Sequence, residues 1–383
     1  MPLPDAVELV RALVAEPSVS SPDPSHDQSN LGVINALAEW AEHVGFSVEV
    51  MPLADPEKAN LIATLGDGPG GLVLSGHTDT VPFDAARWAT DPLELVEKDG
   101  RLFGIGSADM KGFFGAALHA AQRFAAGELK RPVVLLATAD EESTMAGARA
   151  LVDAGRPTAT HCVIGEPTGL SPVHMHKGVL MEQIVVNGRS GHSSDPSLGE
   201  SALEAMHEVI SALLSVRAEL QASHRNDAFE VAVPTLNLGR IEGGDSPNRI
   251  CGSCALTYDV RPLPSMALEA TRAQIRDAVL GRFDSAAVDI ALSTLVPGVP
   301  PFETAVDAAL VRATEDLTGK PSRAVMFCTE GPFFQNMGME TIVCGAGSID
   351  VAHQPNEYTT RAGIAAATEL YASLIQRFCV EVS

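Results

Sequence analysis

Residues 72–79 join a short apolar strand directly to a histidine and an aspartate. Residues 72–74 are aliphatic, which is typical of a strand buried on both faces of a parallel sheet, and Gly76, His77 and Asp79 follow at once. An extended backbone places the side chains of His77 and Asp79 on the same side. One nitrogen of His77 could then bind a metal ion while a carboxylate such as Asp79 orients the ring. A polar turn with a hydrogen-bonded histidine would show the same pattern, so this stretch alone does not establish a metal site.

Carboxylates also follow three later segments that are apolar or rich in glycine. They are Asp109 after residues 104–108, Glu141 and Glu142 after the predicted strand Pro132–Ala139, and Glu166 after the predicted strand Thr160–Ile164. Open α/β sheets carry their functional groups at the carboxyl ends of the strands, so we expect these side chains to gather beside His77. Such a set predicts a metal site, whereas isolated surface glutamates would be solvated. The glycines of residues 104–112 lack the third glycine and the spacing of a dinucleotide-binding loop.

The chain is strongly acidic. Its 26 basic and 49 acidic residues give a net charge of −23. This balance argues against nucleic acid and anionic membranes as partners, because a phosphate backbone is bound by basic patches. The six cysteines occur without a signal-peptide pattern, and no apolar run approaches the ~18–20 residues that span a bilayer. We therefore expect a cytoplasmic location with reduced thiols.

The spacing of apolar residues changes in the middle of the chain. Residues 1–178 and 295–383 alternate apolar strands with helices, as in an α/β domain. Residues 179–294 instead show the order β-α-β-β-α-β, which is that of a ferredoxin-like sandwich with an antiparallel sheet. We expect a catalytic α/β domain formed by 1–178 and 295–383, with an α+β domain of residues 179–294 inserted into it.

Several motifs along the chain resemble those of one enzyme family. They are Ser75–Pro82, Gly106–Gly112, Asp140–Glu142, Gly165–Thr168, Gly191–Pro196 and the late histidine His353. Together they resemble the dinuclear zinc aminoacylase/deacylase metallopeptidases, over nearly the whole chain. The resemblance implies a zinc-peptidase-like catalytic domain with an inserted dimerisation, or lid, domain.

The resemblance also implies two zinc ions per subunit, with Co²⁺ as an alternative metal. The implied ligands are His77 and Glu166 for one ion, Glu142 and His353 for the other, and Asp109 as the bridge between them. Two such ions activate a water molecule and polarise the scissile carbonyl. Glu141 would act as the general base, and Asp79 would orient the ring of His77.

The remaining candidate residues concern the substrate and the partner subunit. We expect Arg261 to bind the α-carboxylate of the substrate, because its planar fork suits a carboxylate, with Asn248 and Lys177 as further candidates. Glu330 is the candidate for a terminal ammonium group. Each of these residues could instead form an ordinary surface ion pair. The resemblance further implies a homodimer of inserted domains, in which His192 acts in the active site of the partner subunit.

Further segments resemble those of one member of that family, and the resemblance implies its activity; they are Pro234–Gly239, Gly243–Cys251, Asp259–Pro264, Cys328–Phe333 and Ala352–Tyr358. That activity is the hydrolysis of N2-acetyl-L-ornithine to L-ornithine and acetate, a step of arginine biosynthesis. The alternatives are a succinyl-diaminopimelate desuccinylase, or a broader N-acyl amino acid deacylase or carboxypeptidase of the same fold. An alternative of another class is a catalytically inactive dimeric binding module. The presence of Glu141 and of the full ligand set argues against that last alternative.

Overall fold

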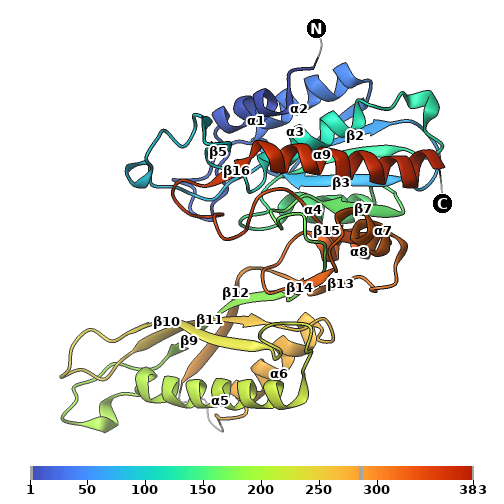
Figure 1. The fold of residues 1–383 in the computed structure, drawn as a ribbon. Helices are drawn as coiled ribbons and strands as arrows, with labels where there is room; N and C mark the ends of the chain where they lie inside the picture. Colours follow the sequence, from blue (N-terminus) through green and yellow to red (C-terminus); the bar gives the residue numbers. More distant parts are fainter. Residues whose placement is uncertain (1–2, 284–287, 382–383) are drawn as a thin grey trace. The chain divides into compact units, whose positions relative to one another are not determined.

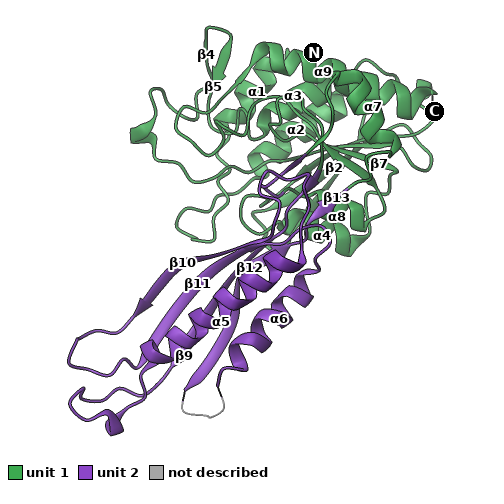
Figure 2. Cartoon of the chain, turned by 60° about the horizontal axis from the view of Figure 1, so that its bottom comes forward, with its two compact units in different colours: residues 1–174, 304–323, 329–383 green, residues 175–303, 324–328 purple. Residues whose placement is uncertain are grey.

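The structure, a computed structural model, describes residues 3–283 and 288–381 of the chain (Figure 1). The chain forms two compact units, which are coloured separately in Figure 2. Unit 1 comprises Met1–His174, Thr304–Arg323 and Thr329–Ser383, and unit 2 comprises Met175–Glu303 and Ala324–Cys328. Among the described residues, no helix is both long enough and apolar enough to cross a membrane.

Unit 1 is built on a mixed sheet whose central strands are parallel. In spatial order the strands are β1 (Ser47–Pro52), β2 (Ala59–Leu65), β6 (Val133–Thr138), β3 (Leu72–His77), β7 (His161–Ile164), β15 (Glu340–Val343) and β8 (Val173–His176). The pairs β6·β3, β3·β7 and β7·β15 are parallel. Every residue of β3, β6 and β7 is buried, as expected for strands covered on both faces.

Helices and sheet share one hydrophobic core in unit 1. The helices that contribute to it are α1 (Ala6–Ala15), α2 (Leu31–Val44), α3 (Lys111–Ala121), α7 (Ala309–Thr318) and α9 (Arg361–Ile375). In α1 the apolar residues recur at helical spacing on the buried face, and the Asp5 carboxylate caps the first turn by accepting from the N–H groups of Val7 and Glu8. The helix α2 ends at Gly45, whose positive φ of 103° suits a glycine. Two shorter helices, α4 (Ala146–Ala154) and α8 (Gly331–Asn336), contact each other.

A second, small sheet in unit 1 joins two distant segments of the chain. Its strands, in spatial order, are β16 (Tyr358–Thr360), β5 (Arg101–Phe103) and β4 (Val96–Lys98). The pairing of Tyr358 with Phe103 places the end of the 353–357 loop beside the start of the 104–109 loop. Both loops carry residues of the candidate site described below.

Unit 2 is an antiparallel sheet with two helices. Its elements, in chain order, are β9 (Val179–Asn187), α5 (Ala202–Ser223), β10 (Thr235–Gly243), β11 (Ser253–Arg261), α6 (Leu268–Leu280) and β12 (Asp289–Val299). The spatial order of the strands is β10-β11-β9-β12, and each neighbouring pair is antiparallel. Alternate residues of β9 and β11 are buried in a core shared with α5 and α6. This arrangement is the predicted ferredoxin-like order.

Unit 2 extends slightly beyond the expected range 179–294. Met175 and His176 pair with the short strand β13 (Phe302–Glu303), and β12 continues to Val299. Residues 324–328, which include part of β14 (Arg323–Val325), also belong to this unit. The chain therefore enters and leaves unit 2 at the end of the sheet where β9 begins and β12 ends.

Candidate metal centre

The candidate ligands lie at the carboxyl ends of parallel strands and in two loops of unit 1. His77 is the last residue of β3, and Glu166 follows β7. Glu142 lies in the turn after β6, Asp109 in the loop before α3, and His353 in the loop before β16. The parallel pairing of β6, β3 and β7 brings these ends to the same edge of the sheet.

Asp109 stands between the two histidines. Its Oδ1 atom lies 3.1 Å from Nε2 of His77, and its Oδ2 atom lies 3.3 Å from Nε2 of His353. Glu166 Oε1 lies 3.9 Å from the same nitrogen of His77, and Glu142 Oε1 lies 2.9 Å from that of His353. The structure thus forms two sets of one histidine and one glutamate, joined by a single aspartate.

The electrostatics of this cluster are dominated by carboxylates taken out of water. Burial raises the pKa of Glu166 well above its usual range, and the neighbouring charge of Asp109 adds to the rise. Burial and the neighbouring charge of Asp109 also raise the pKa of Glu142. Burial also opposes ionisation of Asp109, but hydrogen bonds from His353 and His77 outweigh it and hold the pKa of Asp109 below its usual value. Like charges this close require compensation by positive charge.

The two histidines face these carboxylates, which raise the pKa of both imidazoles. Hydrogen bonds to Asp109 and then Glu142 raise the pKa of His353 to about 10. Burial would lower the pKa of His77, but the hydrogen bond to Asp109 and the nearby carboxylates raise it well above its usual value. The side chain of His353 is 51% exposed, whereas His77 is buried, so the cluster is open to solvent on the His353 side.

This donor set fits divalent cations. Each set offers an imidazole nitrogen and carboxylate oxygens, which are the ligands of catalytic zinc. Ligand atoms of His77, Asp109 and Glu142 all lie within 4.8 Å of one another, and so do those of His77, Glu141 and Glu166. Binding of cations would displace the protons that the histidines otherwise hold.

Glu141 belongs to the cluster without completing either ligand set. Its carboxylate is close to His77 and Glu166. Burial raises its pKa well above the usual range, with further contributions from the neighbouring carboxylates Glu142 and Glu330. A buried carboxylate with a raised pKa beside candidate metal ligands is suited to proton transfer.

The ring of His77 is oriented by a main-chain group and not by the predicted carboxylate. Its Nδ1 atom lies 3.0 Å from the main-chain oxygen of Asp79. The nearest carboxylate oxygen of Asp79 is 3.7 Å away, which is too far for a hydrogen bond. The other oxygen accepts from the main-chain N–H of Glu142 at 3.0 Å. The side chain of Asp79 therefore supports the Glu142 turn, while its carbonyl group sets the histidine ring.

The predicted substrate residues of unit 2 lie in two separate places. Lys177 precedes β9 and is buried, where its Nζ atom donates to the main-chain oxygen of Val233 at 2.7 Å. Arg261 ends β11 at the same end of the sheet, and its Nε atom lies 3.0 Å from Oδ2 of Asp259. Burial lowers the pKa of Lys177, and the charge of Arg261 lowers it further.

His192 and Asn248 lie beyond the opposite end of that sheet. His192 is exposed, its Nδ1 atom is 2.7 Å from Oγ of Ser194, and its backbone pairs with Arg249 in an isolated bridge. Oδ1 of Asn248 accepts from Ser246 Oγ at 2.6 Å. At about 3.4 Å per residue, the nine residues of β9 separate this group from Lys177 and Arg261. The structure does not bring these four residues of unit 2 together.

Glu330 lies in unit 1, directly before α8. It is only 1% exposed, and its Oε2 atom accepts from Thr138 Oγ1 at 3.0 Å at the end of β6. Its Oε1 atom has no hydrogen-bond partner among the described residues. Burial raises its pKa to about 7. This oxygen is therefore a buried acceptor that a cationic group could satisfy.

The turn that carries Glu141 and Glu142 is held by a buried lysine that the sequence analysis missed. The Nζ atom of Lys58 lies 2.7 Å from Asp140 Oδ1 and 2.9 Å from Asp27 Oδ1, and Ser20 Oγ donates to the same atom of Asp140. Asp140 has a positive φ of 58°, so it is the residue at which the chain turns after β6. No local sequence signal pairs Lys58 with a residue so far along the chain.

We expect Lys58→Met to destabilise the protein. The substitution keeps the apolar stem and leaves the largely buried Asp140 carboxylate unpaired, which costs roughly 3 kcal/mol. Urea unfolding of the metal-free protein would measure the change, with the exposed Lys98→Met as control. A loss no larger than that of the control would show that the Lys58–Asp140 pair does not stabilise the fold.

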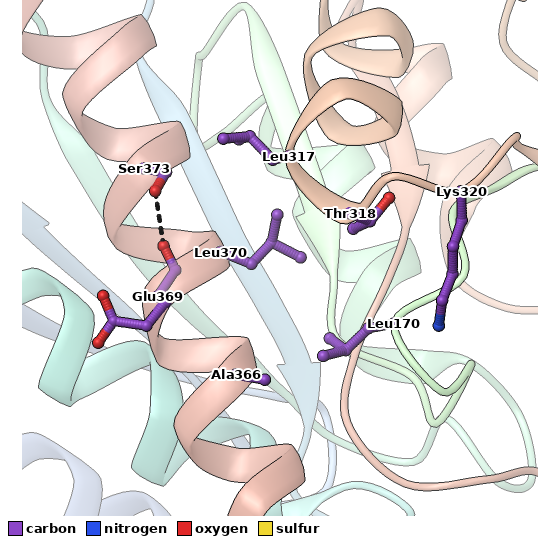
Figure 3. A pocket seen from close by; sticks show the side chains of 8 residues that line it. All are labelled: Leu170, Leu317, Thr318, Lys320, Ala366, Glu369, Leu370 and Ser373. Atoms are coloured by element: carbon purple, nitrogen blue, oxygen red, sulfur yellow. Dashed lines mark hydrogen bonds between the residues drawn. The ribbon is translucent and has the colours of Figure 1, made fainter.

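One cavity of the structure lies away from this cluster. A hollow of about 410 Å³ is lined by residues of α7, α9 and the segments beside them, including Leu317, Leu370 and Ser373 (Figure 3). Its two charged residues already have partners: Lys320 donates to the main-chain oxygen of Gly169, and Glu369 pairs with Arg123. It contains none of the ligand candidates. This hollow therefore shares no lining residue with the candidate metal centre.

Comparisons with known proteins agree with this geometry. The acetylornithine deacetylase of Pectobacterium atrosepticum is 46% identical over 380 residues, which cover 99% of each chain. An M20 family metallo-carboxypeptidase from Sulfolobus solfataricus has the same fold, with a TM-score of 0.77 at 18% identity over 97% of this chain and 99% of that one. A dinuclear metal-binding peptidase of the M20 family from Bacillus subtilis gives a TM-score of 0.67 at 16% identity over 96% of both chains. The model of peptidase family M20/M25/M40 matches residues 73–377, and the chain belongs to that family.

Proposed function

We propose that this chain hydrolyses N2-acetyl-L-ornithine to L-ornithine and acetate with the help of two divalent metal ions. The observation that carries the chemistry is the position of Asp109 between His77 and His353, each of which also faces a glutamate. The substrate is supported by the 46% identity to an acetylornithine deacetylase over almost the full length of both chains. An amide bond is the group that such a centre is suited to cleave.

Each ligand has a proposed place in the centre. His77 and Glu166 would hold one ion, Glu142 and His353 would hold the other, and Asp109 would be the ligand that the two sites share. The ions are Zn²⁺, with Co²⁺ as an alternative, because imidazole and carboxylate ligands suit both metals. When bound, two such ions would polarise the scissile carbonyl and lower the pKa of a water molecule between them.

Glu141 moves the proton in this proposal. Its carboxylate accepts a proton from the attacking water as the water oxygen bonds to the carbonyl carbon. It then delivers that proton to the amide nitrogen as the carbon–nitrogen bond breaks, so that the nitrogen leaves as a neutral amine and not as an amide anion. The proximity of Glu141 to His77 and Glu166 supports a role for it beside the centre.

The substrate's charged ends need fixed partners of opposite charge. We assign the α-carboxylate to Arg261, with Lys177 at the same end of the unit 2 sheet as an additional donor, since a guanidinium fork matches a carboxylate. Asn248 lies beyond the opposite end of that sheet and is not assigned to the same carboxylate. We assign the terminal ammonium of ornithine to Glu330, whose Oε1 atom has no hydrogen-bond partner among the described residues. An ammonium beside Glu330 would favour its ionised form and oppose the effect of burial on its pKa.

Glu330→Gln is expected to weaken kcat/KM for N2-acetyl-L-ornithine by about 10–100-fold, since hydrogen bonds to charged groups contribute about 1.5–3 kcal/mol. N-acetylmethionine has no distal ammonium, so its hydrolysis should change far less. Steady-state kinetics on both substrates measure the ratio. Equal losses on the two would assign Glu330 to the scaffold.

We propose a cytoplasmic homodimer formed through unit 2, in which His192 completes the active site of the partner subunit. His192 is exposed and lies at the end of the unit 2 sheet opposite to the one where the chain enters and leaves. A donor on the far side of the scissile carbonyl would stabilise the developing oxyanion, and loss of one such donor costs about 10²–10³ in kcat.

Mixed dimers test the assignment of His192. Chains carrying His192→Ala and chains carrying Glu141→Gln should each be nearly inactive alone, and mixing them should restore activity. In each mixed dimer one of the two sites contains both wild-type groups. A mixture that stays inactive after subunit exchange has been verified would place His192 outside the partner's site. The adjacent Ser193→Ala serves as a control that leaves the imidazole in place.

The substrate assignment is tested with a panel of acylated amino acids on the metal-loaded enzyme. We expect N2-acetyl-L-ornithine to be hydrolysed with the highest kcat/KM, above N-succinyl-diaminopimelate, N-acetylmethionine and a dipeptide. A preference for the succinylated substrate would favour a desuccinylase, and equal rates on all would favour a broad deacylase or carboxypeptidase. Bound metal without turnover of any member would favour a catalytically inactive binding module.

A further inference from the structure

Glu357 is a buried carboxylate that none of the proposed roles uses. It is 1% exposed and lies four residues after His353, directly before β16. Both of its carboxylate oxygens accept hydrogen bonds from main-chain N–H groups. Oε1 accepts from Ala108 at 2.8 Å and from Asp109 at 3.0 Å, and Oε2 accepts from Gly106 at 3.1 Å.

The main chain of Glu357 contacts the same loop. Its carbonyl oxygen accepts from the N–H of Gly104 at 3.1 Å. Four N–H groups of residues 104–109 therefore point at one residue. Three of them donate to its buried carboxyl group and one to its main-chain oxygen, so the loop forms a concave set of donors around Glu357. Gly106 has a positive φ of 71°, and a Cβ atom there would lie 2.8 Å from Thr80 Cγ2, so the loop requires glycine at this position.

These contacts join the two loops that carry ligands. The 104–109 loop ends in Asp109, and the 353–357 loop begins with His353. Pairing of Tyr358 with Phe103 fixes the two chains next to each other just outside the loops. The contact between Asp109 Oδ2 and His353 Nε2 at 3.3 Å closes the ring on the other side. Glu357 occupies the interior of that ring, so its carboxylate sets where Asp109 stands relative to His353.

We propose that Glu357 is a positioning residue that holds Asp109 as the shared ligand of the two metal sites; this inference rests on the proposed function. Asp109 must direct one carboxylate oxygen toward His77 and the other toward His353. Because both oxygens are needed, the backbone of Asp109 has little freedom to move. Groups that orient metal ligands through hydrogen bonds affect metal affinity or activity by about 10–100-fold. Glu357 does so through main-chain N–H groups.

The role requires an acceptor-only side chain. A carboxylate can accept all three N–H groups on its two oxygens. The amide of glutamine has one oxygen and one NH₂ group. In one orientation the NH₂ group would face the N–H of Gly106, and in the other it would face those of Ala108 and Asp109. In both orientations two hydrogen-bond donors would point at each other. Glu357→Gln therefore preserves size and burial while it removes the fit to the loop.

The test measures metal binding and main-chain exchange in the Glu357→Gln protein. Titration of the metal-free protein with Zn²⁺ should show one of the two ions bound about 10–100-fold more weakly than in the wild type. The kcat for N2-acetyl-L-ornithine should fall at limiting Zn²⁺ and recover with excess Zn²⁺, while KM stays the same. Glu97→Gln is the matched control, because Glu97 lies on β4 of the same small sheet and pairs with Arg361. A folded Glu357→Gln protein that binds both ions as the control does would overturn the proposal.

Hydrogen–deuterium exchange of the metal-free protein gives a readout independent of metal and catalysis. In the wild type the amides of Gly106, Ala108 and Asp109 should be protected, and in Glu357→Gln they should exchange faster. Should the variant fail to fold, rapid exchange of these amides in the wild type alone would overturn the proposal. A wild-type chain that binds fewer than two ions would refute the two-metal function, and the exchange result would still decide whether Glu357 holds the loop.

Discussion

Glu141→Gln is expected to lower kcat for N2-acetyl-L-ornithine by about 10²–10⁴-fold while both metal ions stay bound. Glutamine has nearly the size of glutamate but cannot accept a proton from water, so the proton has no carrier from the attacking water to the amide nitrogen. Glu141 lies close to His77 and Glu166, and the proposal gives it the role of the base and not that of a ligand. Turnover measurements combined with elemental analysis of the same sample test both parts of the expectation.

The neighbouring residue provides the matched control. Glu142 Oε1 faces Nε2 of His353 at 2.9 Å, so Glu142→Gln should weaken metal binding as well as activity. Both variants replace a glutamate by a glutamine, at adjacent positions of the chain. We nevertheless expect them to differ in the amount of metal that they bind. Normal turnover in Glu141→Gln would transfer the base role to another group. Loss of an ion in that variant would make Glu141 a ligand.

Removal of divalent metal is expected to reduce activity by at least about 10³-fold, because cations of this kind contribute several kcal/mol to stabilisation of transition-state charge. In the metal-free protein the histidines hold protons against the carboxylates, as the raised pKa of His353 to about 10 indicates. No group would then polarise the scissile carbonyl. Dialysis against a chelator, followed by elemental analysis and assay, measures the effect.

Reconstitution separates loss of metal from loss of fold. Zn²⁺ or Co²⁺ should restore activity, since both accept imidazole and carboxylate ligands. Mg²⁺ should restore much less, because it prefers six oxygen ligands in octahedral geometry. Full activity in protein shown to be free of metal would contradict a metal-dependent mechanism altogether.

The sequence permitted prediction of those site residues that follow a strand directly. His77, Glu142 and Glu166 each come soon after an apolar run, and parallel pairing necessarily brings the ends of such runs together. His353 lies in a loop with a positive φ of 58°, and only the resemblance pointed to it. Its position depends on pairing between two three-residue strands, β5 and β16, that lie far apart in the chain. Strands this short have no detectable periodicity.

Hydrogen bonds between side chains and main-chain groups were the second feature that the sequence did not predict. The sequence shows which side chains are present, but any residue can offer a carbonyl or an N–H group. His77 is oriented by the carbonyl of Asp79, although the carboxylate was the expected group. Glu357 binds three N–H groups whose residue types carry no signal. Lys177, a candidate for the substrate's carboxylate, donates to the carbonyl of Val233.

The fold of unit 2 was predictable because its signal is regular. Alternating burial along β9 and β11 follows the alternation of apolar and polar residues in the sequence. The long helix α5 buries Met206, Val209, Leu213, Val216 and Leu220 at helical spacing. The exact limits of the unit were less accessible, since β12 continues through Pro297 and Gly298, which usually weaken a strand pattern.

Anomalous diffraction at the zinc edge, from crystals of the zinc-loaded enzyme, tests the central claim most directly. The account predicts two zinc peaks per chain, roughly 3.5–4 Å apart, with one oxygen of Asp109 on each. His77 and Glu166 should contact one peak, and Glu142 and His353 the other. A single peak under saturating zinc, or two peaks of which only one touches Asp109, would contradict the two-metal centre proposed for this protein.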